Sequence, residues 1–363
     1  DYEALDRFLA EKGVKKILLV SGNSSKRLAI WEHLMGLRER CGISVVHFGD
    51  FSPNPKYESV LAGTALYRAE GCDMVLTVGG GSAMDTAKCI KMFATMDPGT
   101  DYLEQKIVPN EIPFVAMPTT AGTGSEATRF AVIYVKGNKY SVADESCLPE
   151  AVILDPSVLV TLPPYQKKAT MLDTLGHAME SFWACESTPE SREEAAEAIR
   201  GFMKYKEGYL ANTPEGNAGM LLAAHMAGKA INRTRTTAGH AMCYKLTTLY
   251  GLPHGHSVAL CNRTLFLWLV RHTDRCIDPR GEEYLKSMLA ELAQLLECES
   301  AEDAAEYVSD YMDAIGMEVP EAREEDYPVL AGSANPARMK NFPAALDAET
   351  IEELYREILQ KRA

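Results

Sequence analysis

The sequence predicts a two-domain protein, with an α/β domain in residues 1–160 followed by an all-α domain in residues 161–363. Short apolar runs alternate with helical stretches up to residue 160, which is typical of βαβ units and a mostly parallel sheet. After Pro163 and Pro164, strand patterns nearly disappear and helical periodicity takes over. The length of 363 residues also suits two domains.

Five apolar runs are the expected strands of the first domain: 16–20, 43–48, 73–78, 114–117 and 151–154. Short apolar runs bounded by turn residues are typical of buried strands. The first run ends in such a turn, at Ser21, Gly22 and Asn23. Between the third and fourth runs, residues 83–95 have the spacing of a helix.

The second domain is expected to be helical throughout. Apolar residues recur at helical spacing over seven stretches: 169–185, 192–209, 218–231, 239–250, 281–296, 301–315 and 348–360. The longest purely apolar runs are far shorter than the roughly 18 residues that a membrane span needs.

Composition excludes several classes of protein. The net charge of −14 opposes binding to nucleic acid or an anionic membrane, although a local basic pocket for a small anionic substrate stays open. The nine cysteines are odd in number and include no CxxC, which argues against a disulfide framework or a zinc knuckle. A reducing cytoplasm therefore fits best. The chain begins at Asp1 without methionine, so we expect residues or a leader to precede it.

Two loops have the composition of a dinucleotide site. The first, Gly79-Gly80-Gly81-Ser82, lies between a strand and a helix, where glycine allows close approach to a phosphate and the helix N-terminus offers free N–H groups. It lacks the GxGxxG spacing, and a plain strand-to-helix turn is the alternative. The second loop, residues 118–126, includes Thr119 and Thr120 and follows the next strand. Loops at the ends of adjacent parallel strands are where ligands bind in such sheets.

Four residues of the helical half could hold a metal ion. Asp173 and His177 are four residues apart, so they lie on one face of a helix. His240 and His254 follow, and Pro253 ends a helix so that His254 can turn toward the same point. One carboxylate and three imidazoles suit a divalent transition metal. A surface hydrogen bond and helix caps are the alternative.

The order and spacing of these motifs resemble the iron-containing (group III) alcohol dehydrogenases over essentially the whole chain. Asp85 and Lys88 after the glycine loop belong to the same pattern. The resemblance implies a dehydroquinate-synthase-like fold, with the active site between the two domains. It also implies that Asp173, His177, His240 and His254 bind Fe²⁺ or Zn²⁺, and we expect a homodimer.

The resemblance further implies an NAD(P)H site formed by Gly22, Asn23, Ser24, Gly79, Gly80, Gly81, Ser82, Asp85, Thr119, Thr120 and Lys139. Many NAD-preferring members carry an aspartate where Gly22 stands, and Ser24, Ser25 and Lys26 follow here. We therefore expect the 2′-phosphate of NADPH to be tolerated or preferred. Many members also carry another histidine where this chain has Tyr244. Tyr244 and His256 are the candidate proton donors.

The stretches 236–247, 253–256 and 335–341 look closest to the branch that includes phosphonoacetaldehyde reductases. The expected function is the interconversion of a small aldehyde and a primary alcohol, with an anionic aldehyde such as phosphonoacetaldehyde as one substrate and phosphonate metabolism as one setting. In reduction the metal acts as a Lewis acid while the nicotinamide delivers hydride. One alternative is a dehydroquinate-synthase-like lyase or cyclase that uses NAD transiently. Another is a non-catalytic metal-binding scaffold.

Overall fold

The computed structural model describes residues 2–334 and 336–361, and the chain divides into two compact units. The first unit comprises residues 1–120 and 125–158, and the second comprises 121–124 and 159–363. Sequence analysis placed segment 121–124 in the α/β domain, but it packs with the helical unit. The reason is close backbone contact: a Cβ on Gly124 would lie 2.5 Å from the Cα of Gly228.

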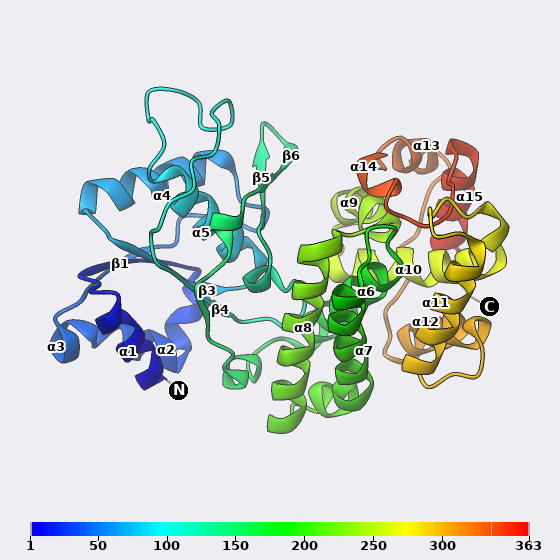
Figure 1. Cartoon of the computed structure of the whole chain (residues 1–363), viewed down its shortest axis with the longest axis horizontal. Coiled ribbons are helices and arrows are strands. Elements are labelled where there is room, and N and C mark those ends of the chain that lie inside the picture. The colour runs from blue at the N-terminus through cyan, green and yellow to red at the C-terminus, as the bar shows by residue number, and fades with distance from the viewer. Residues whose placement is uncertain (1, 335, 362–363) are drawn as a thin grey trace. The chain divides into compact units, whose positions relative to one another are not determined.

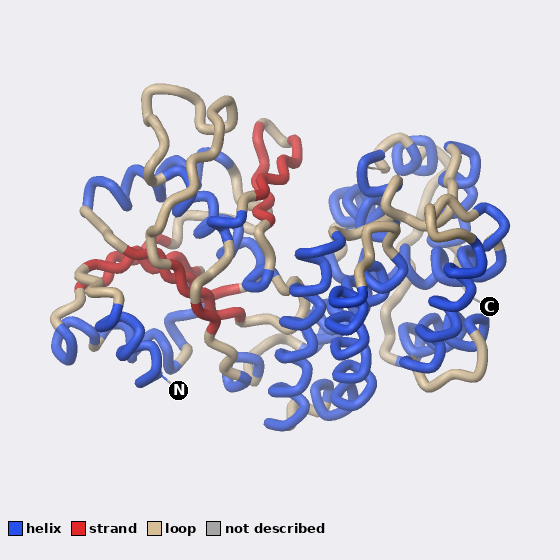
Figure 2. The backbone as a smooth tube through the Cα atoms, viewed as in Figure 1, coloured by secondary structure: helices blue, strands red, loops and turns tan. Residues whose placement is uncertain are grey.

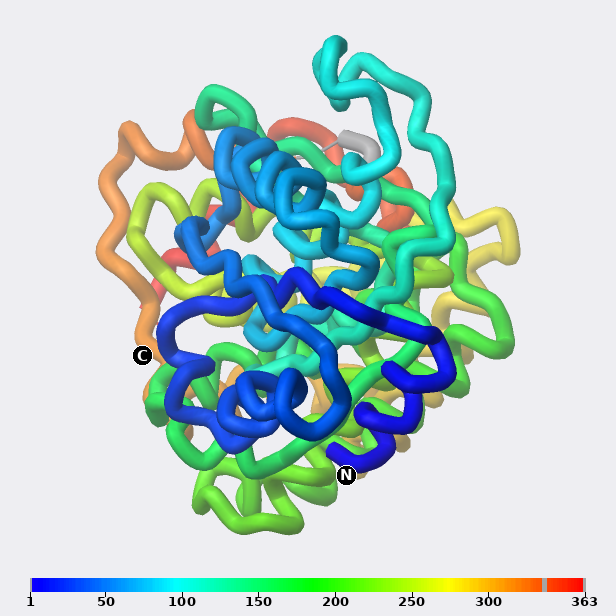
Figure 3. The backbone as a smooth tube through the Cα atoms, turned by 90° about the vertical axis from the view of Figure 1, so that its left-hand side faces the viewer, coloured from blue at the N-terminus to red at the C-terminus, as the bar shows by residue number. Residues whose placement is uncertain are grey.

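The first unit is built on a parallel sheet with the strand order β2-β1-β3-β4-β7. Helices α4 (Tyr57–Glu70) and α5 (Gly81–Phe93) cover one face, and α1 (Tyr2–Glu11), α2 (Ala29–Met35) and α3 (Leu37–Cys41) cover the other (Figures 1 and 3). The strands are β1 (Lys16–Ser21), β2 (Ser44–Phe48), β3 (Met74–Gly79), β4 (Phe114–Pro118) and β7 (Ala151–Val152). The fold class expected from the sequence is thereby confirmed.

Two features of this unit differ from the sequence prediction. The last strand, β7, spans only Ala151–Val152. An antiparallel hairpin of β5 (Phe130–Val135) and β6 (Asn138–Ala143) was not foreseen. Its second strand is largely exposed and carries polar residues, so the apolar alternation that marks a strand is weak. Lys136 and Gly137 turn the hairpin, both with positive φ, as a type I′ turn requires.

The second unit is helical, as Figure 2 shows by the absence of strands over the part of residues 159–361 that the structure describes. Its helices are α6 (Pro164–Trp183), α7 (Pro189–Leu210), α8 (Pro214–Thr234), α9 (Ala238–Tyr250), α10 (His254–Arg271), α11 (Glu282–Leu295), α12 (Ala301–Ala314), α13 (Asp326–Ala331), α14 (Pro336–Met339) and α15 (Ala348–Ile358). The helices predicted from the sequence did not include α10 or the short helices α13 and α14. Residues 255–263 of α10 are all buried, and polar residues such as Asn262 and Arg263 are among them, so a single apolar face does not stand out in its sequence. Among the described residues, no helix is long and apolar enough to cross a membrane.

Helix α6 is the centre of the helical unit, packed against α7, α8 and α10. Every residue from 171 to 183 is buried. The start of α10 approaches α6 so closely that a Cβ on Gly255 would lie 2.0 Å from the carbonyl oxygen of Ala169 and 2.8 Å from the Cβ of Asp173. Glycine at position 255 therefore allows the first turn of α10 to lie beside Asp173.

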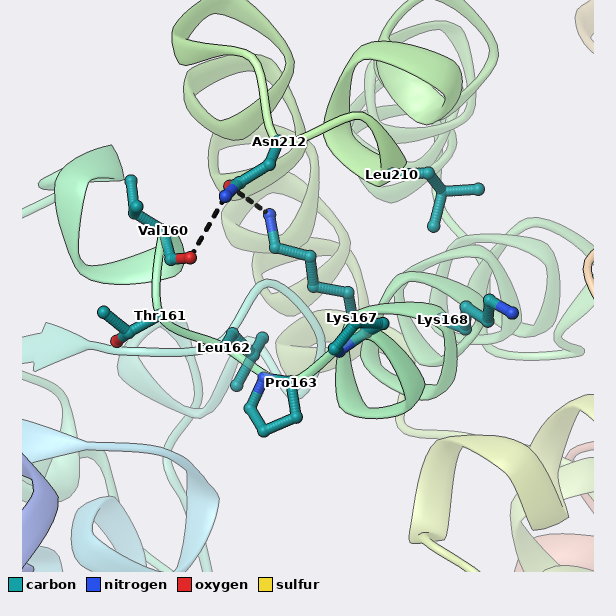
Figure 4. Close-up of a pocket in the computed structure, with 9 residues that line it drawn as sticks. Val160, Thr161, Leu162, Pro163, Lys167, Lys168, Leu210 and Asn212 are labelled. Carbon is teal, nitrogen blue, oxygen red and sulfur yellow. Dashed lines mark hydrogen bonds between the residues drawn. The ribbon is translucent and has the colours of Figure 1, made fainter.

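A cavity of about 340 Å³ lies where α6 begins and α7 ends, lined in part by Val160, Pro163 and Leu210 (Figure 4). The buried Lys167 ammonium donates hydrogen bonds there to Asn212 Oδ1 (2.8 Å) and Asn217 Oδ1 (2.7 Å). These contacts connect α6 to the turn that follows α7 and to the first turn of α8. The cavity walls contain none of the residues proposed from the sequence as metal ligands.

Candidate active site

Asp173 lies at the centre of a cluster of imidazoles in the helical unit. Its Oδ1 atom is 3.5 Å from Nε2 of His240 and 3.9 Å from Nε2 of His254. Asp173, His240 and His254 each offer one possible ligand atom, and these three atoms lie within 4.8 Å of one another. Asp173 and His240 are buried, whereas the His254 side chain is 40% exposed. The residues come from α6, α9 and α10, so the cluster exists only in the folded unit.

The donor atoms of this cluster fit a divalent metal ion. Asp173 Oδ1 and His240 Nε2 are buried and lack a hydrogen-bond partner in the part of the chain that the structure describes. Such atoms are costly to bury unless something else binds them. Burial alone would raise the pKa of Asp173, but the neighbouring His177, His240 and His254 outweigh it and hold that pKa well below its usual value. An ionised carboxylate with imidazole nitrogens is a donor set for Fe²⁺ or Zn²⁺.

His177 lies beside this cluster but outside the 4.8 Å group. Its ring stacks on His240, with 4.4 Å between the ring centroids, and its Nδ1 is 4.0 Å from Asp173 Oδ2. The same Nδ1 lies 3.3 Å from the carbonyl oxygen of Gly122, which leaves Nε2 as the atom that could bind a metal. Burial lowers the pKa of His177 to about 4, so the imidazole is neutral at pH 7, as a metal ligand must be.

Glu180, which was not among the residues predicted from the sequence, is fully buried beside His240. Its Oε1 is 2.7 Å from His240 Nδ1. Burial would raise the pKa of Glu180, but the charge of His240 and the hydrogen bonds that Glu180 accepts lower it to about 2. A signal was present in the sequence, because Glu180 stands seven residues after Asp173 and three after His177, on the same face of α6.

The two candidate proton donors have different surroundings. The Tyr244 ring lies nearly parallel to that of His254, with 6.2 Å between centroids, and the Arg338 guanidinium is 5.5 Å from the centre of the Tyr244 ring. His256 is buried, its Nδ1 lies 2.8 Å from the Tyr165 hydroxyl, and burial lowers its pKa to about 4. His256 is thus neutral at pH 7. Asn335, the first residue of the late 335–341 motif, lies outside the described residues.

The residues proposed for the dinucleotide lie at the carboxyl ends of neighbouring strands in the first unit. Gly79 ends β3, pairs with Pro118 at the end of β4, and precedes the N-terminus of α5. A Cβ on Gly80 would touch the Thr120 side chain at 3.5 Å, so the glycine loop and the threonine loop are adjacent. Gly81 and Ser82 form the first turn of α5, where backbone N–H groups are free to bind an anion.

Other residues of this group flank the two loops. Gly22 follows β1 and precedes a short 3₁₀ turn, Asn23–Arg27, that carries Ser24. The Ser25 hydroxyl lies in hydrogen-bond range of the Ser21 hydroxyl and of the Gly22 carbonyl oxygen, both as acceptors. The Lys26 ammonium lies 5.7 Å from the centre of the Trp31 ring.

On α5, Asp85 accepts a hydrogen bond from Ser125, and burial raises the pKa of Asp85 although the charges of Lys88 and, more weakly, of Lys139 in β6 oppose that rise. Lys88 is fully buried, and its ammonium donates to the carbonyl oxygens of Ser125, Thr128 and Phe130. Lys88 therefore holds the segment after the threonine loop in place.

Comparison with known proteins identifies the family. The model of the iron-containing alcohol dehydrogenases matches residues 1–156, and the model of the family's C-terminal part matches residues 167–359. The chain belongs to the iron-containing alcohol dehydrogenase family. It is therefore an oxidoreductase acting on CH–OH groups.

Individual relatives of this family extend over most of the chain. Alcohol dehydrogenase 4 of Schizosaccharomyces pombe is 31% identical over 89% of this chain and 77% of its own length. Phosphonoacetaldehyde reductase of Streptomyces viridochromogenes is 32% identical over 85% of this chain and 81% of its own. Among solved structures, 1,3-propanediol oxidoreductase has a TM-score of 0.85 at 27% identity, covering 97% of this chain and 94% of its own. Sulfoacetaldehyde reductase of Bifidobacterium kashiwanohense, solved with NAD⁺, has a TM-score of 0.85 at 25% identity, and the match covers 99% of this chain and 94% of that protein's chain.

Proposed function

We propose that this protein is a metal-dependent, NAD(P)H-linked reductase of a small aldehyde that carries an anionic group, and that it also catalyses the reverse oxidation of the alcohol. The observation that carries the metal requirement is the convergence of Asp173, His240 and His254, with two buried donor atoms lacking a partner among the described residues. His177, stacked on His240, is proposed as the fourth ligand.

When bound, the metal would polarise the substrate carbonyl and the nicotinamide would supply hydride. Residues of the chain itself would bind the metal ion and the dinucleotide and would supply the proton. Asp173 and the imidazoles hold the cation, while the N-terminus of α5 and the glycine and threonine loops bind the dinucleotide phosphates. We propose Tyr244, whose ring stacks beside that of His254, as the donor of the proton that completes the alcohol. His256 is a weaker candidate, because its ring is neutral at pH 7 and already bound to Tyr165.

The anionic substrate class rests on Arg338 and on two relatives. The guanidinium of Arg338 lies 5.5 Å from the centre of the Tyr244 ring, and that ring is 6.2 Å from the ring of the proposed ligand His254, so one aromatic ring separates a positive charge from the proposed metal site. Guanidinium groups bind phosphonate or sulfonate oxygens in bidentate fashion. A phosphonoacetaldehyde reductase and a sulfoacetaldehyde reductase are among the proteins that the chain resembles. Both names describe a two-carbon aldehyde with an anionic group.

The test is a steady-state assay of the metal-loaded enzyme with phosphonoacetaldehyde, sulfoacetaldehyde and the neutral propionaldehyde, each with NADH and with NADPH. We expect both anionic aldehydes to exceed propionaldehyde in kcat/KM by about 10–100-fold, the amount expected from one charge-assisted pair of about 1.5–3 kcal/mol. Removal of metal with a chelator should abolish turnover. Equal kcat/KM for neutral and anionic aldehydes would reject the substrate class, and full activity of metal-free protein would reject the metal requirement.

A further inference from the structure

Glu180 is the most completely hydrogen-bonded buried carboxylate near the proposed metal ligands, and nothing described so far gives it a function. Its Oε1 faces His240 Nδ1 at 2.7 Å and also receives the Nδ2 group of Asn262 at 2.9 Å. Its Oε2 receives the backbone N–H and the hydroxyl of Thr237. Each of these partners can donate a hydrogen bond, so the carboxylate is surrounded by donors.

This arrangement determines how His240 presents its ring. Because the carboxylate can only accept, Nδ1 of His240 must carry the proton of that hydrogen bond. The lone pair of the neutral ring is then on Nε2, which is the atom that faces Asp173 Oδ1 at 3.5 Å. The hydrogen bond thus selects the tautomer and the ring orientation that a metal ion requires at this position.

The surroundings of Glu180 are built to allow this contact. A Cβ at position 239 would lie 2.4 Å from Glu180 Oε1 and 1.9 Å from Asn262 Oδ1, so only glycine permits the carboxylate to reach His240. Asn262 comes from α10 and Thr237 from the residue before α9, so Glu180 connects α6 with both other helices of the cluster. The Trp183 indole, which donates to the Thr237 hydroxyl at 3.0 Å, supports the same turn.

A purely structural role is the competing explanation. Glu180 also accepts the backbone N–H groups of Thr237 and His240, so it anchors the first turn of α9 in the manner of an N-terminal cap. Removing a cap would lower the stability of the fold. It would leave the affinity of an otherwise intact site for metal unchanged, which separates the two explanations.

We propose that Glu180 is a positioning residue of the metal site, which orients His240 through its Nδ1–H and raises the affinity of the site for a divalent cation. The inference rests on the proposed metal requirement. Partners of this kind contribute about 10–100-fold to metal affinity in known sites. Asn262, which holds the carboxylate from α10, contributes to the same orientation at the lower end of that range.

The test compares Glu180→Gln with the wild type and with a matched control, Glu194→Gln. Glu194 is another buried carboxylate of the helical unit, on α7, and it pairs with Arg233 at 2.9 Å rather than with a proposed ligand. The affinity of each metal-free protein for Zn²⁺ is measured by competition with a chromophoric chelator, and that for Co²⁺ by its visible absorption. Thermal unfolding of the metal-free proteins is measured in parallel.

We expect Glu180→Gln to bind Zn²⁺ about 10–100-fold more weakly than the wild type and to alter the Co²⁺ spectrum, while Glu194→Gln loses stability without losing affinity. Equal Zn²⁺ affinity of Glu180→Gln and wild type would overturn the inference and leave a structural cap. If Glu180→Gln does not fold, Asn262→Ala decides: weaker Zn²⁺ binding by about tenfold supports the inference, and unchanged binding overturns it. A wild type that binds neither ion would instead reject the proposed metal requirement itself.

Discussion

Substitution of Gly79 by alanine tests the proposed dinucleotide site through one steric contact. Gly79 ends β3, and a Cβ at this position would lie 2.5 Å from the Cβ of Ala83 in the first turns of α5, with the next atom of Ala83, its Cα, at 3.9 Å. Gly79 does not have the positive φ that favours glycine, so alanine brings no backbone strain. The cost is therefore the collision with Ala83 alone.

The size of the effect follows from that distance. Two carbon atoms pack best at about 3.5–4.0 Å, so α5 must move away from β3 by roughly 1 Å. Overpacking of this kind costs about 1–3 kcal/mol. Ala83→Gly removes the colliding atom and leaves an ordinary contact to its Cα, at a cost of about 1 kcal/mol in helix propensity. The double variant should therefore be less destabilised than the sum of the two single variants by about 1–3 kcal/mol.

The assay is a double-mutant cycle on thermal stability and on NADPH binding, with Ala83→Gly as the control for helix propensity. Because Gly79→Ala moves the N-terminus of α5 from the proposed phosphate position, we expect its Kd for NADPH to rise at least tenfold, which is about 1.4 kcal/mol. The double variant should regain most of that affinity. Unchanged NADPH binding by Gly79→Ala, or failure of Ala83→Gly to restore it, would refute the placement of the dinucleotide at this turn.

Four further predictions concern single side chains. His254→Ala should lose bound metal and turnover together, and a variant that keeps stoichiometric metal would contradict its role as a ligand. Tyr244→Phe should lower kcat at least about tenfold at unchanged metal content, since general acid catalysis contributes about 10²–10⁴-fold; a smaller loss assigns the proton to another group. Gly22→Asp should shift the kcat/KM ratio toward NADH by at least about tenfold through repulsion of the 2′-phosphate, and an unaltered ratio would place that phosphate elsewhere. Burial lowers the pKa of Lys167 to about 8, so between pH 8 and 10.5 the unfolded chain binds more protons than the folded one. The free energy of unfolding of the wild type should therefore rise with pH in this window, relative to Lys167→Met, by at most about 1.4 kcal/mol per pH unit, and parallel pH profiles would refute the shift.

Local sequence patterns were enough to predict most elements of the fold. The parallel strands are continuous apolar runs, and glycines and prolines mark their ends, so a short window of sequence carries the signal. The same is true of Asp173 and His177, whose spacing alone places them on one helix face. Several elements were missed, namely the hairpin of the apolar strand β5 and the largely polar strand β6, and the helices α10, α13 and α14.

Contacts between distant residues were decided only by the tertiary structure. The spacing of Glu180 from Asp173 and His177 puts it on their face of α6, but it does not indicate which distant residues Glu180 meets, namely His240 and Asn262, 60 and 82 residues further along the chain. Segment 121–124 joins the helical unit because Gly124 and Gly228 let two backbones touch, a contact that no periodicity encodes. The sequence by itself thus determined which side chains could bind a metal and a dinucleotide. Which atoms face one another depends on how whole helices pack, because packing sums many small contacts across the chain and no short window of residues contains them.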